Sequence, residues 1–276
     1  MMNIDKDIKS NTFYQLVANP DVYLRNLLER TCYIGAFTFL VYKIVGLLNL
    51  ESYSFPVTMH SLIGFIIGLL LVFRNNSAYE RWWDGRKLIS TLASETSLIN
   101  ARLNVIMKSK TESRKSVKNF KKELAELMLL NGAYLVSRRS RTITYIFEKE
   151  QDKLIEKLFT CINEIDPTNH TTSGLNTSMN NIINSNAQLG RIKNTPIPIA
   201  YVYHIKISVL IYLVTLPFGM FHDLGLFAVP IVMLLYYIIA GVEIISNEIE
   251  NPFGSDPNDL PTEELFMSII KTIENE

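Results

Sequence analysis

The strongest constraint on the fold of this chain is a set of four apolar runs that come as two close pairs. The runs cover residues 31–50, 52–73, 205–221 and 224–246. An α-helix needs about 20 mainly apolar residues to cross the hydrocarbon core of a bilayer, and runs of this length are typical of transmembrane helices. The connectors within each pair are too short to be domains. The sequence therefore predicts an integral membrane protein with four transmembrane helices in two hairpins.

Few charged side chains fall within these runs. Lys43 lies in the first run, Lys206 near the start of the third and Glu243 in the fourth, while the second run carries no charge. We therefore expect no ion pair within a single membrane unit. Because polar and charged groups within spans usually mark transport paths, one copy of the chain does not readily form a polar path by itself.

The distribution of basic residues predicts the orientation in the membrane. Residues 74–204 contain 20 Lys and Arg against 12 Asp and Glu, and residues 247–276 contain one base against 8 acids. Arg25, Arg30 and Arg74 flank the first pair of runs, and neither short connector contains Lys or Arg. Because basic flanks stay in the cytoplasm, both termini and the long central segment are expected on the cytoplasmic side.

The long segment between the two hairpins is predicted to be helical, because apolar residues recur there at helical spacing and no alternating strand pattern competes. The repeats are Leu88, Leu92 and Ile99; Phe120, Leu124, Leu127, Met128, Ala133 and Leu135; Leu154, Ile155, Leu158 and Ile162; and Leu175, Met179, Ile182, Ile183 and Leu189. The fold is therefore predicted to be all-α. The expected segments are a cytoplasmic N-terminal segment (1–30), a first transmembrane hairpin (31–73), a helical cytoplasmic domain (74–204), a second transmembrane hairpin (205–246) and a cytoplasmic C-terminal tail (247–276).

Several function classes are disfavoured by what the sequence lacks. It shows no Gly-rich phosphate loop, no paired Cys and His residues at metal-ligand spacing and no nucleophile motif. Neither an enzyme nor a bound cofactor or metal is therefore expected. The basic cluster Ser137–Arg141 allows a lipid- or nucleic-acid-binding patch, but a solvated helix end that pairs with the acidic tail is favoured, and no nucleic-acid partner is predicted.

Three stretches carry a resemblance to a known family. The first is FRNNSAYERWWDGRKL at Phe73–Leu88, where an apolar run changes into a basic and aromatic segment without a linker. The second is Gly190–Tyr201, where Gly-Arg-Ile-Lys is followed by NTPIPIAY, and the third is NPFGSDPNDLP at Asn251–Pro261. With these stretches in order, and with two apolar hairpins around a helical insert, the sequence resembles the bestrophin family over nearly its whole length.

The resemblance implies a homopentameric ion channel with an axial pore for small monovalent ions. In the second run, Phe65, Leu69 and Phe73 form an apolar stripe at helical spacing, which Thr58 and Ser61 continue outward. Five copies around an axis would give a polar outer mouth above a hydrophobic constriction, and narrow apolar rings gate by dewetting. The resemblance assigns this ring as the neck of the pore.

The resemblance also implies a second, cytoplasmic constriction, which counting back from Arg191 places near His170. Family members tend to have an aliphatic residue at this aperture, so His170 departs from the family pattern. Asn75 and Asn76 are expected as polar side chains at the base of the neck, offered to neighbouring helices or to hydrated ions.

The acidic run after the fourth apolar run bears on calcium. Eukaryotic members of the family bind calcium partly through a dense acidic run after Asn-Pro-Phe-Gly. Here Ser255–Asp259 offers only two carboxylates, whereas calcium prefers 6–8 oxygen ligands. A calcium-independent prokaryotic member, located in the plasma membrane, is therefore predicted.

Two alternative functions stay open on the sequence. A membrane scaffold that docks a partner protein would not need an apolar stripe on a symmetry axis. A membrane enzyme would have to use the polar cluster Asn75, Asn76, Glu80, Arg81 and Asp84, which contains no evident nucleophile–base set. Ion selectivity is also open between chloride or other anions and sodium-type cations, because an apolar neck carries no charge.

Overall fold

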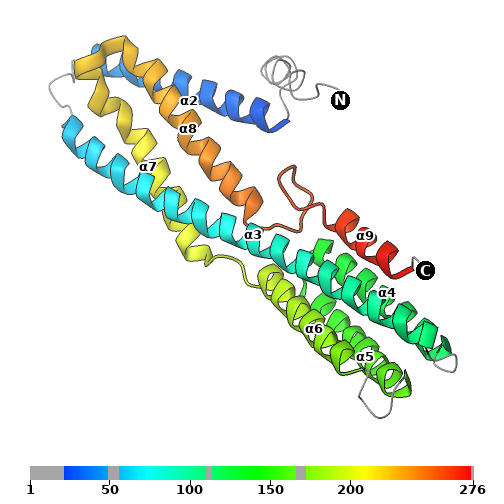
Figure 1. The fold of residues 1–276 in the computed structure, drawn as a ribbon. Coiled ribbons are helices and arrows are strands. Elements are labelled where there is room, and N and C mark those ends of the chain that lie inside the picture. Colours follow the sequence, from blue (N-terminus) through cyan, green and yellow to red (C-terminus); the bar gives the residue numbers. More distant parts are fainter. Residues whose placement is uncertain (1–21, 49–55, 110–113, 166–171, 275–276) are drawn as a thin grey trace, which may run out of the picture. The chain divides into compact units, whose positions relative to one another are not determined.

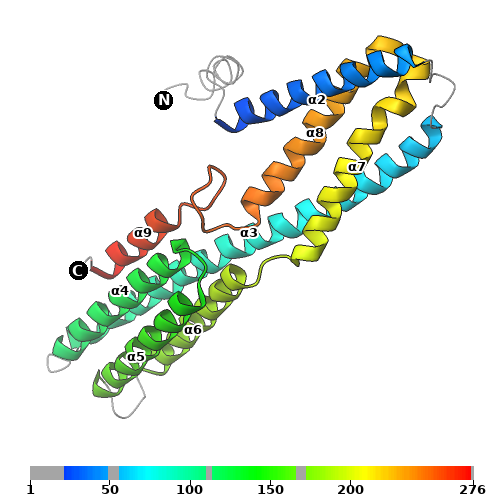
Figure 2. The same ribbon diagram turned by 180° about the vertical axis from the view of Figure 1, so that it is seen from behind.

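The computed structural model describes residues 22–48, 56–109, 114–165 and 172–274, and every regular element within these ranges is a helix (Figures 1 and 2). The elements are α2 (Val22–Leu47), α3 (Val57–Ser109), α4 (Arg114–Val136), α5 (Arg141–Ile165), α6 (Ser173–Asn194), α7 (Ile199–Leu224), the short 3-10 helix η2 (Gly225–Phe227), α8 (Ala228–Ile249) and α9 (Thr262–Glu274). The prediction of an all-α fold is confirmed.

The chain divides into two compact units. The first unit comprises residues 1–75 and 198–246 and contains α2, the first part of α3, α7 and most of α8. The second unit comprises residues 76–197 and 247–276 and contains the rest of α3 together with α4, α5, α6 and α9. Helix α3 is continuous over 53 residues, so the change from apolar to charged sequence takes place inside one helix.

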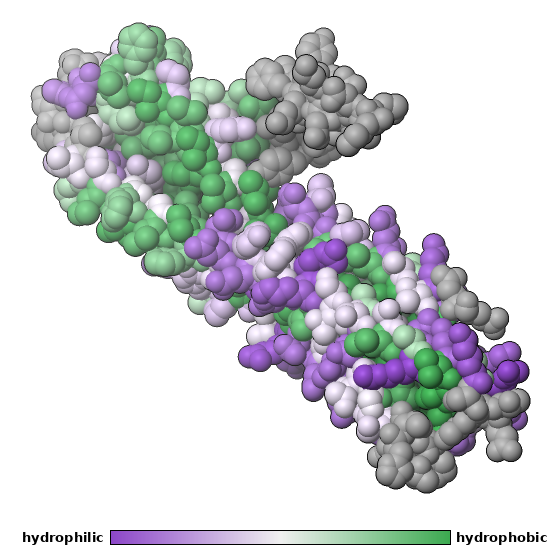
Figure 3. Space-filling view, in the orientation of Figure 1, coloured by the Kyte–Doolittle hydropathy of each residue, from purple (hydrophilic) through white to green (hydrophobic). Residues whose placement is uncertain are grey.

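The first unit carries the apolar helices. Three segments of the described chain are long and apolar enough to cross a membrane: Arg25–Leu47, Thr58–Lys108 and Ile199–Ile249. The third contains both α7 and α8, joined by η2, so four helices are available as spans. Much of their apolar surface is exposed in the single chain, as the green area around α7 and α8 in Figure 3 shows. The predicted membrane protein with two transmembrane hairpins is confirmed.

Helix boundaries differ from the apolar runs by several residues. Helix α7 begins at Ile199, six residues before the third run, because Pro198 forms its N-cap and accepts a hydrogen bond from the Tyr201 N–H at 3.0 Å. Proline suits the start of a helix, where its missing N–H would have no intrahelical partner in any case. Asn194 ends α6 and Ile199 begins α7, so the two helices are separated by residues 195–198, which include Pro196 and Pro198.

Two glycines allow α3 and α7 to approach closely in the first unit. A Cβ atom at Gly64 would lie 2.6 Å from the Tyr212 hydroxyl oxygen, and one at Gly219 would lie 2.7 Å from Nδ1 of His60. His60 is itself buried, and its Nε2 atom lies 3.1 Å from the Thr215 carbonyl oxygen. Because such tight contacts leave no room for sliding, they fix one face of α3 against α7.

The second unit has one hydrophobic core, shared by α3, α4, α5, α6 and α9. Most residues that helical spacing predicts for the core are buried there, including Phe120 and Leu158. Of the apolar residues that recur at helical spacing, Ala133 is exposed, and Leu88, Ile155 and Ile183 are half-buried against the core. A small side chain such as that of Ala133 is compatible with either face of a helix, so spacing alone does not place it.

Candidate functional site

The predicted neck residues lie on one exposed face of α3. Phe65, Leu69 and Phe73 are 69%, 45% and 55% exposed, and Thr58 and Ser61 are also exposed. At 3.6 residues per turn, these five positions fall along one side of the helix. The described part of the first unit therefore leaves uncovered an apolar stripe that has polar residues at its N-terminal end.

The opposite face of α3 packs inside the first unit. His60, Ile67, Leu71 and Arg74 are buried, and two of them, Ile67 and Leu71, belong to a cluster that also contains residues of α7 and α8. This burial orients α3, because one side is fixed within the unit and the stripe faces away from it. The predicted aperture residue, His170, lies outside the described residues.

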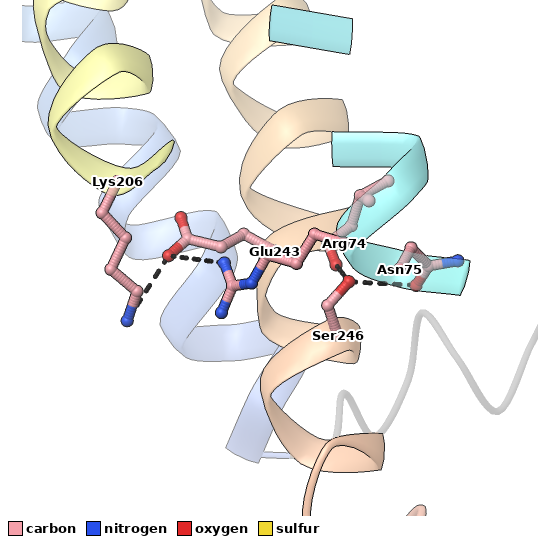
Figure 4. Close-up of polar contacts among 6 residues, drawn as sticks. Arg74, Asn75, Lys206, Glu243 and Ser246 are labelled. Atoms are coloured by element: carbon pink, nitrogen blue, oxygen red, sulfur yellow. Dashed lines mark hydrogen bonds and ion pairs between the residues drawn. The ribbon is translucent and has the colours of Figure 1, made fainter. Parts of the chain in front are cut away.

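A charged triad lies where the apolar part of α3 ends (Figure 4). Nη1 of Arg74 lies 3.8 Å from Oε1 of Glu243 in α8, and Nζ of Lys206 in α7 lies 3.6 Å from the same oxygen. Arg74 is fully buried, whereas the Lys206 side chain is 42% exposed. The expectation of no ion pair within the membrane unit is wrong, because side chains at the ends of two apolar runs both reach Glu243. Two cations share one carboxylate, which leaves an excess of positive charge at this level.

Asn75 connects α3 to α8. Its Oδ1 atom accepts a hydrogen bond from the Ser246 hydroxyl at 3.0 Å, and its side chain is half-buried (Figure 4). Asn76 is exposed. Of the two amides predicted for the base of the neck, Asn75 therefore links α3 to α8, and Asn76 is accessible on the surface of the chain.

The stretches singled out in the sequence meet in the second unit, where Arg81 connects them. Its guanidinium donates to three main-chain carbonyl oxygens, from Nε to Glu250 at 3.0 Å, from Nη1 to Thr195 at 2.6 Å and from Nη2 to Ile192 at 2.6 Å. The rigid fork of an arginine suits this task, because its donors diverge in fixed directions. One side chain thus joins α3, the end of α6 and the segment that follows α8.

Trp82 and Gly85 extend this connection to the C-terminal segment. The Trp82 Nε1–H donates to the Asn258 carbonyl oxygen at 2.9 Å. The ring of Phe253 is buried so close to α3 that a Cβ atom at Gly85 would lie 3.1 Å from its Cζ atom. The basic and aromatic segment after the second apolar run therefore holds the end of α6 and the segment after α8 against α3.

Lys193, near the end of α6, is a buried cation that helical spacing did not single out. It is 2% exposed, and its Nζ donates to the Tyr134 carbonyl oxygen, to the Ser137 carbonyl oxygen at 2.9 Å and to the Ser137 hydroxyl at 2.8 Å. Burial, and secondarily the charge of Arg139, lowers the pKa of Lys193 to about 8. The ammonium closes the C-terminal end of α4, whose last carbonyl groups have no intrahelical donors.

The acidic run after α8 forms a turn. Oδ2 of Asp259 accepts a hydrogen bond from the Asp256 N–H at 2.7 Å, and burial raises the pKa of Asp259 to about 6. Within the described ranges, no group of three or more His, Cys, Asp or Glu side chains is placed to hold a metal ion. The hydrogen bond to the Asp256 N–H thus assigns Asp259 to the folding of the C-terminal segment.

Comparison with known proteins places this architecture among membrane proteins of one family. The sequence model described as "Bacterial/Fungal Bestrophin protein" matches residues 9–275. The chain is 30% identical over 239 residues to a voltage-dependent anion channel-forming protein of Nostoc sp., covering 80% of this chain and 78% of the relative. A protein of Synechocystis sp. with the same description is 29% identical over 245 residues, covering 81% and 78%.

The fold is shared with solved structures. A crystal structure of a bacterial bestrophin homolog from Klebsiella pneumoniae matches with a TM-score of 0.79 and 17% sequence identity, covering 90% of this chain and 97% of that chain. At this identity the match shows the fold alone. Because the family model spans nearly the whole sequence and the Nostoc relative aligns over four-fifths of it, the chain belongs to the bestrophin family.

Proposed function

We propose that this chain assembles as a homopentamer and forms an ion channel for small monovalent ions in the plasma membrane of a prokaryote. The observation that carries the proposal is the exposed stripe of Phe65, Leu69 and Phe73 on α3, whose opposite face is fixed within the first unit. A closed ring of identical subunits would cover such a stripe on a shared axis. The names of the two relatives, both channel-forming proteins, support the same function and indicate a channel rather than an enzyme.

In the proposed pore, five copies of the stripe form a hydrophobic neck. Thr58 and Ser61 line the outer mouth, and Asn75 and Asn76 lie at the base of the neck. A narrow apolar ring does not retain a water column, so the neck closes by dewetting and conducts when it widens. His170 is proposed for a second constriction further along the path.

The proposed topology places both hairpins, residues 31–73 and 205–246, in the membrane. Residues 1–30, 74–204 and 247–276 lie in the cytoplasm. This topology is supported by the excess of Lys and Arg in the segment between the hairpins. Both short connectors lack Lys and Arg.

Anions are the expected permeant ions. Both relatives are named as anion channel-forming proteins. The triad of Arg74, Lys206 and Glu243 contributes two positive charges and one negative charge at the level of Phe73, on the face of α3 opposite to the stripe. A local excess of positive charge raises the concentration of anions near it.

The assembly is tested by mass. Native mass spectrometry of the full-length protein in a neutral detergent should give five times the chain mass of 31.6 kDa. A sample that contains only a stable monomer or dimer, and no larger species, would contradict a pore on a five-fold axis.

The neck is tested by ion flux from liposomes that contain the purified protein. Replacing Phe65, Leu69 and Phe73 together with alanine should widen and hydrate the ring and so increase the flux. The matched control replaces three exposed apolar residues of α7, Ile207, Leu210 and Ile211, with alanine, and should leave the flux unchanged. Equal fluxes for the wild type and a folded neck variant would place the pore elsewhere.

A further inference from the structure

A cavity of about 470 Å³ lies in the second unit, between the corner that joins α4 to α5 and the segment that follows α8. Arg138 and Arg139 line it from the corner, Lys193 from the end of α6, and Glu250 and Asn251 from the segment after α8. Three of these five side chains are cations and one is a carboxylate. The cavity therefore has a positive lining.

The two arginines have donors left for a ligand. Both are exposed, and among the described residues no carboxylate lies within ion-pair distance of either. Arg139 donates from Nη2 to the amide oxygen of Asn251 at 3.1 Å, which is a neutral acceptor. A guanidinium has five N–H donors, so one such bond leaves most of the fork available. The favoured expectation that this cluster pairs with acidic residues of the C-terminal segment is therefore wrong for the described residues.

The one carboxylate of the cavity is engaged on its other side. Oε1 of Glu250 accepts a hydrogen bond from the Ile197 N–H at 3.3 Å. Its charge also acts on Arg81, where it opposes the lowering of the arginine pKa by burial. The charge of Glu250 therefore partly compensates that of Arg81. The charges of Arg138 and Arg139 are then available to a ligand from outside the chain.

Lys193 makes the corner rigid and positive without being a ligand itself. Its ammonium is saturated by the carbonyl oxygens of Tyr134 and Ser137 and by the Ser137 hydroxyl. These bonds hold the residue that directly precedes Arg138 and Arg139. The fork of each arginine thus starts from a fixed backbone, which reduces the entropy lost when it binds.

A second cavity, of about 420 Å³, shares Arg139 and continues the positive surface. It is also lined by Ser140 and Arg141, and by Thr144 and Glu148 in the first turns of α5. Arg139 therefore lines both cavities, and the hydroxyl groups of Ser140 and Thr144 add neutral donors beside it. Guanidinium forks with nearby hydroxyl donors match the oxygen atoms of a phosphate group.

The cavity walls are joined directly to membrane helices along the chain. Glu250 follows the last residue of α8, Ile249, and Lys193 lies six residues before the first residue of α7, Ile199. Basic pockets beside membrane helices are suited to the head groups of anionic phospholipids. The geometry points to a phosphate-binding site at Arg138 and Arg139, and the occupant proposed for it is the head group of an anionic phospholipid.

The test uses the full-length protein in a neutral detergent. Binding of phosphatidylglycerol is measured by native mass spectrometry and by the shift in unfolding temperature, with phosphatidylcholine as the neutral lipid. In the double variant Arg138→Gln and Arg139→Gln, we expect the affinity for phosphatidylglycerol to fall by about tenfold or more, because two charge-assisted contacts are lost. Lys193 is left intact so that the corner stays folded.

The matched control removes the same charge from exposed positions of α4, with Lys118→Gln and Lys122→Gln, and should bind like the wild type. Replacing both arginines with lysine should restore part of the binding. A second arm titrates inorganic phosphate and glycerol phosphate at constant ionic strength. Binding in the lipid arm alone identifies a head group, and competition by the soluble phosphates identifies a free phosphate as a ligand of the same site.

Equal affinities of the arginine variant and the wild type in both arms would overturn the proposal. An equal loss in the arginine variant and in the lysine control would also overturn it, because that result indicates attraction by net charge alone. No current is measured, so the outcome is independent of whether the chain conducts ions.

Discussion

The guanidinium of Arg74, fully buried in α3, lies 3.8 Å from the carboxylate of Glu243 in α8. Arg74 directly follows Phe73, the last residue of the exposed stripe, so the contact fixes α3 where the proposed neck ends. A buried cation is costly unless a charge of opposite sign accompanies it. Glu243 is therefore the residue on which the position of this end of the stripe depends.

Replacing Glu243 with glutamine should destabilise the protein by about 3–5 kcal/mol, because the buried Arg74 guanidinium would lose the carboxylate of Glu243. The readout is thermal unfolding in detergent. Glu263→Gln removes an exposed carboxylate from the first turn of α9 and serves as the matched control, with a loss of no more than about 1 kcal/mol expected. A Glu243 variant as stable as this control would show that the ion pair does not hold the helices.

Lys206 should affect selectivity more than stability. It is the more exposed cation of the triad, so Lys206→Met should cost about 1 kcal/mol or less. It removes the excess positive charge and should lower the anion-to-cation permeability ratio, measured from reversal potentials. Lys43→Met, which removes an exposed lysine from α2, should leave the ratio as it is. If the permeability ratio is unchanged in both variants, the triad does not contribute to ion selectivity.

Replacing Lys193 with methionine should destabilise the second unit by about 1–3 kcal/mol, because the Ser137 carbonyl oxygen loses the ammonium donor and the Tyr134 carbonyl oxygen keeps only the Ser137 N–H and hydroxyl. With a pKa of about 8 the lysine is still mostly charged at neutral pH. Lys122→Met, at an exposed position of α4, is the control. If the two variants unfold at the same temperature, the ammonium does not close the end of α4.

Asp259 should make stability depend on pH in acid. Its pKa in the folded protein, about 6, lies above that of an unfolded aspartate, about 3.9, so its ionisation costs stability as pH rises between these values. Asp259→Asn keeps an oxygen acceptor for the Asp256 N–H and should be more stable than the wild type at pH 7 by about 1 kcal/mol, after allowance for solvent screening.

At pH 4 the wild type and Asp259→Asn should unfold at nearly the same temperature, because the aspartate is then largely protonated in the folded state. Asp256→Asn, at an exposed position of the same turn, keeps the Asp259 carboxylate and should retain the dependence on pH, because burial is the main cause of the raised pKa of Asp259. A constant difference between wild type and Asp259→Asn across this range would rule out the titration of Asp259 as its cause.

Much of the fold could be predicted because apolar spacing carries it directly. Leu124, Leu158 and Met179 belong to three segments in which apolar residues recur at helical intervals, and all three are buried in the core of the second unit. The stripe of Phe65 and Leu69 was visible for the same reason, although its exposure depends on what α7 covers. Periodicity reports which face of a helix is apolar, and it does not report whether that face meets lipid, a neighbouring helix or another subunit.

The contacts that hold the site together could not be predicted in the same way. Arg81 binds carbonyl oxygens, and these carry no sequence signal because every residue has one. Glu243 and Arg74 are far apart in the chain and stand alone in their segments, so no spacing rule pairs them. Lys193 has the sequence context of a solvated helix end, and only the fold shows that the end of α4 covers it.

The central claim, that this chain forms an ion-conducting pore with a preference for anions, is tested most directly by recording from planar bilayers. Purified wild-type protein is reconstituted and currents are measured in asymmetric NaCl. The account predicts single-channel currents that reverse near the equilibrium potential of chloride and that grow when the neck residues are replaced with alanine. Bilayers in which the folded oligomer is present but no current exceeds that of protein-free membranes would contradict the channel, and reversal near the sodium potential would contradict the preference for anions.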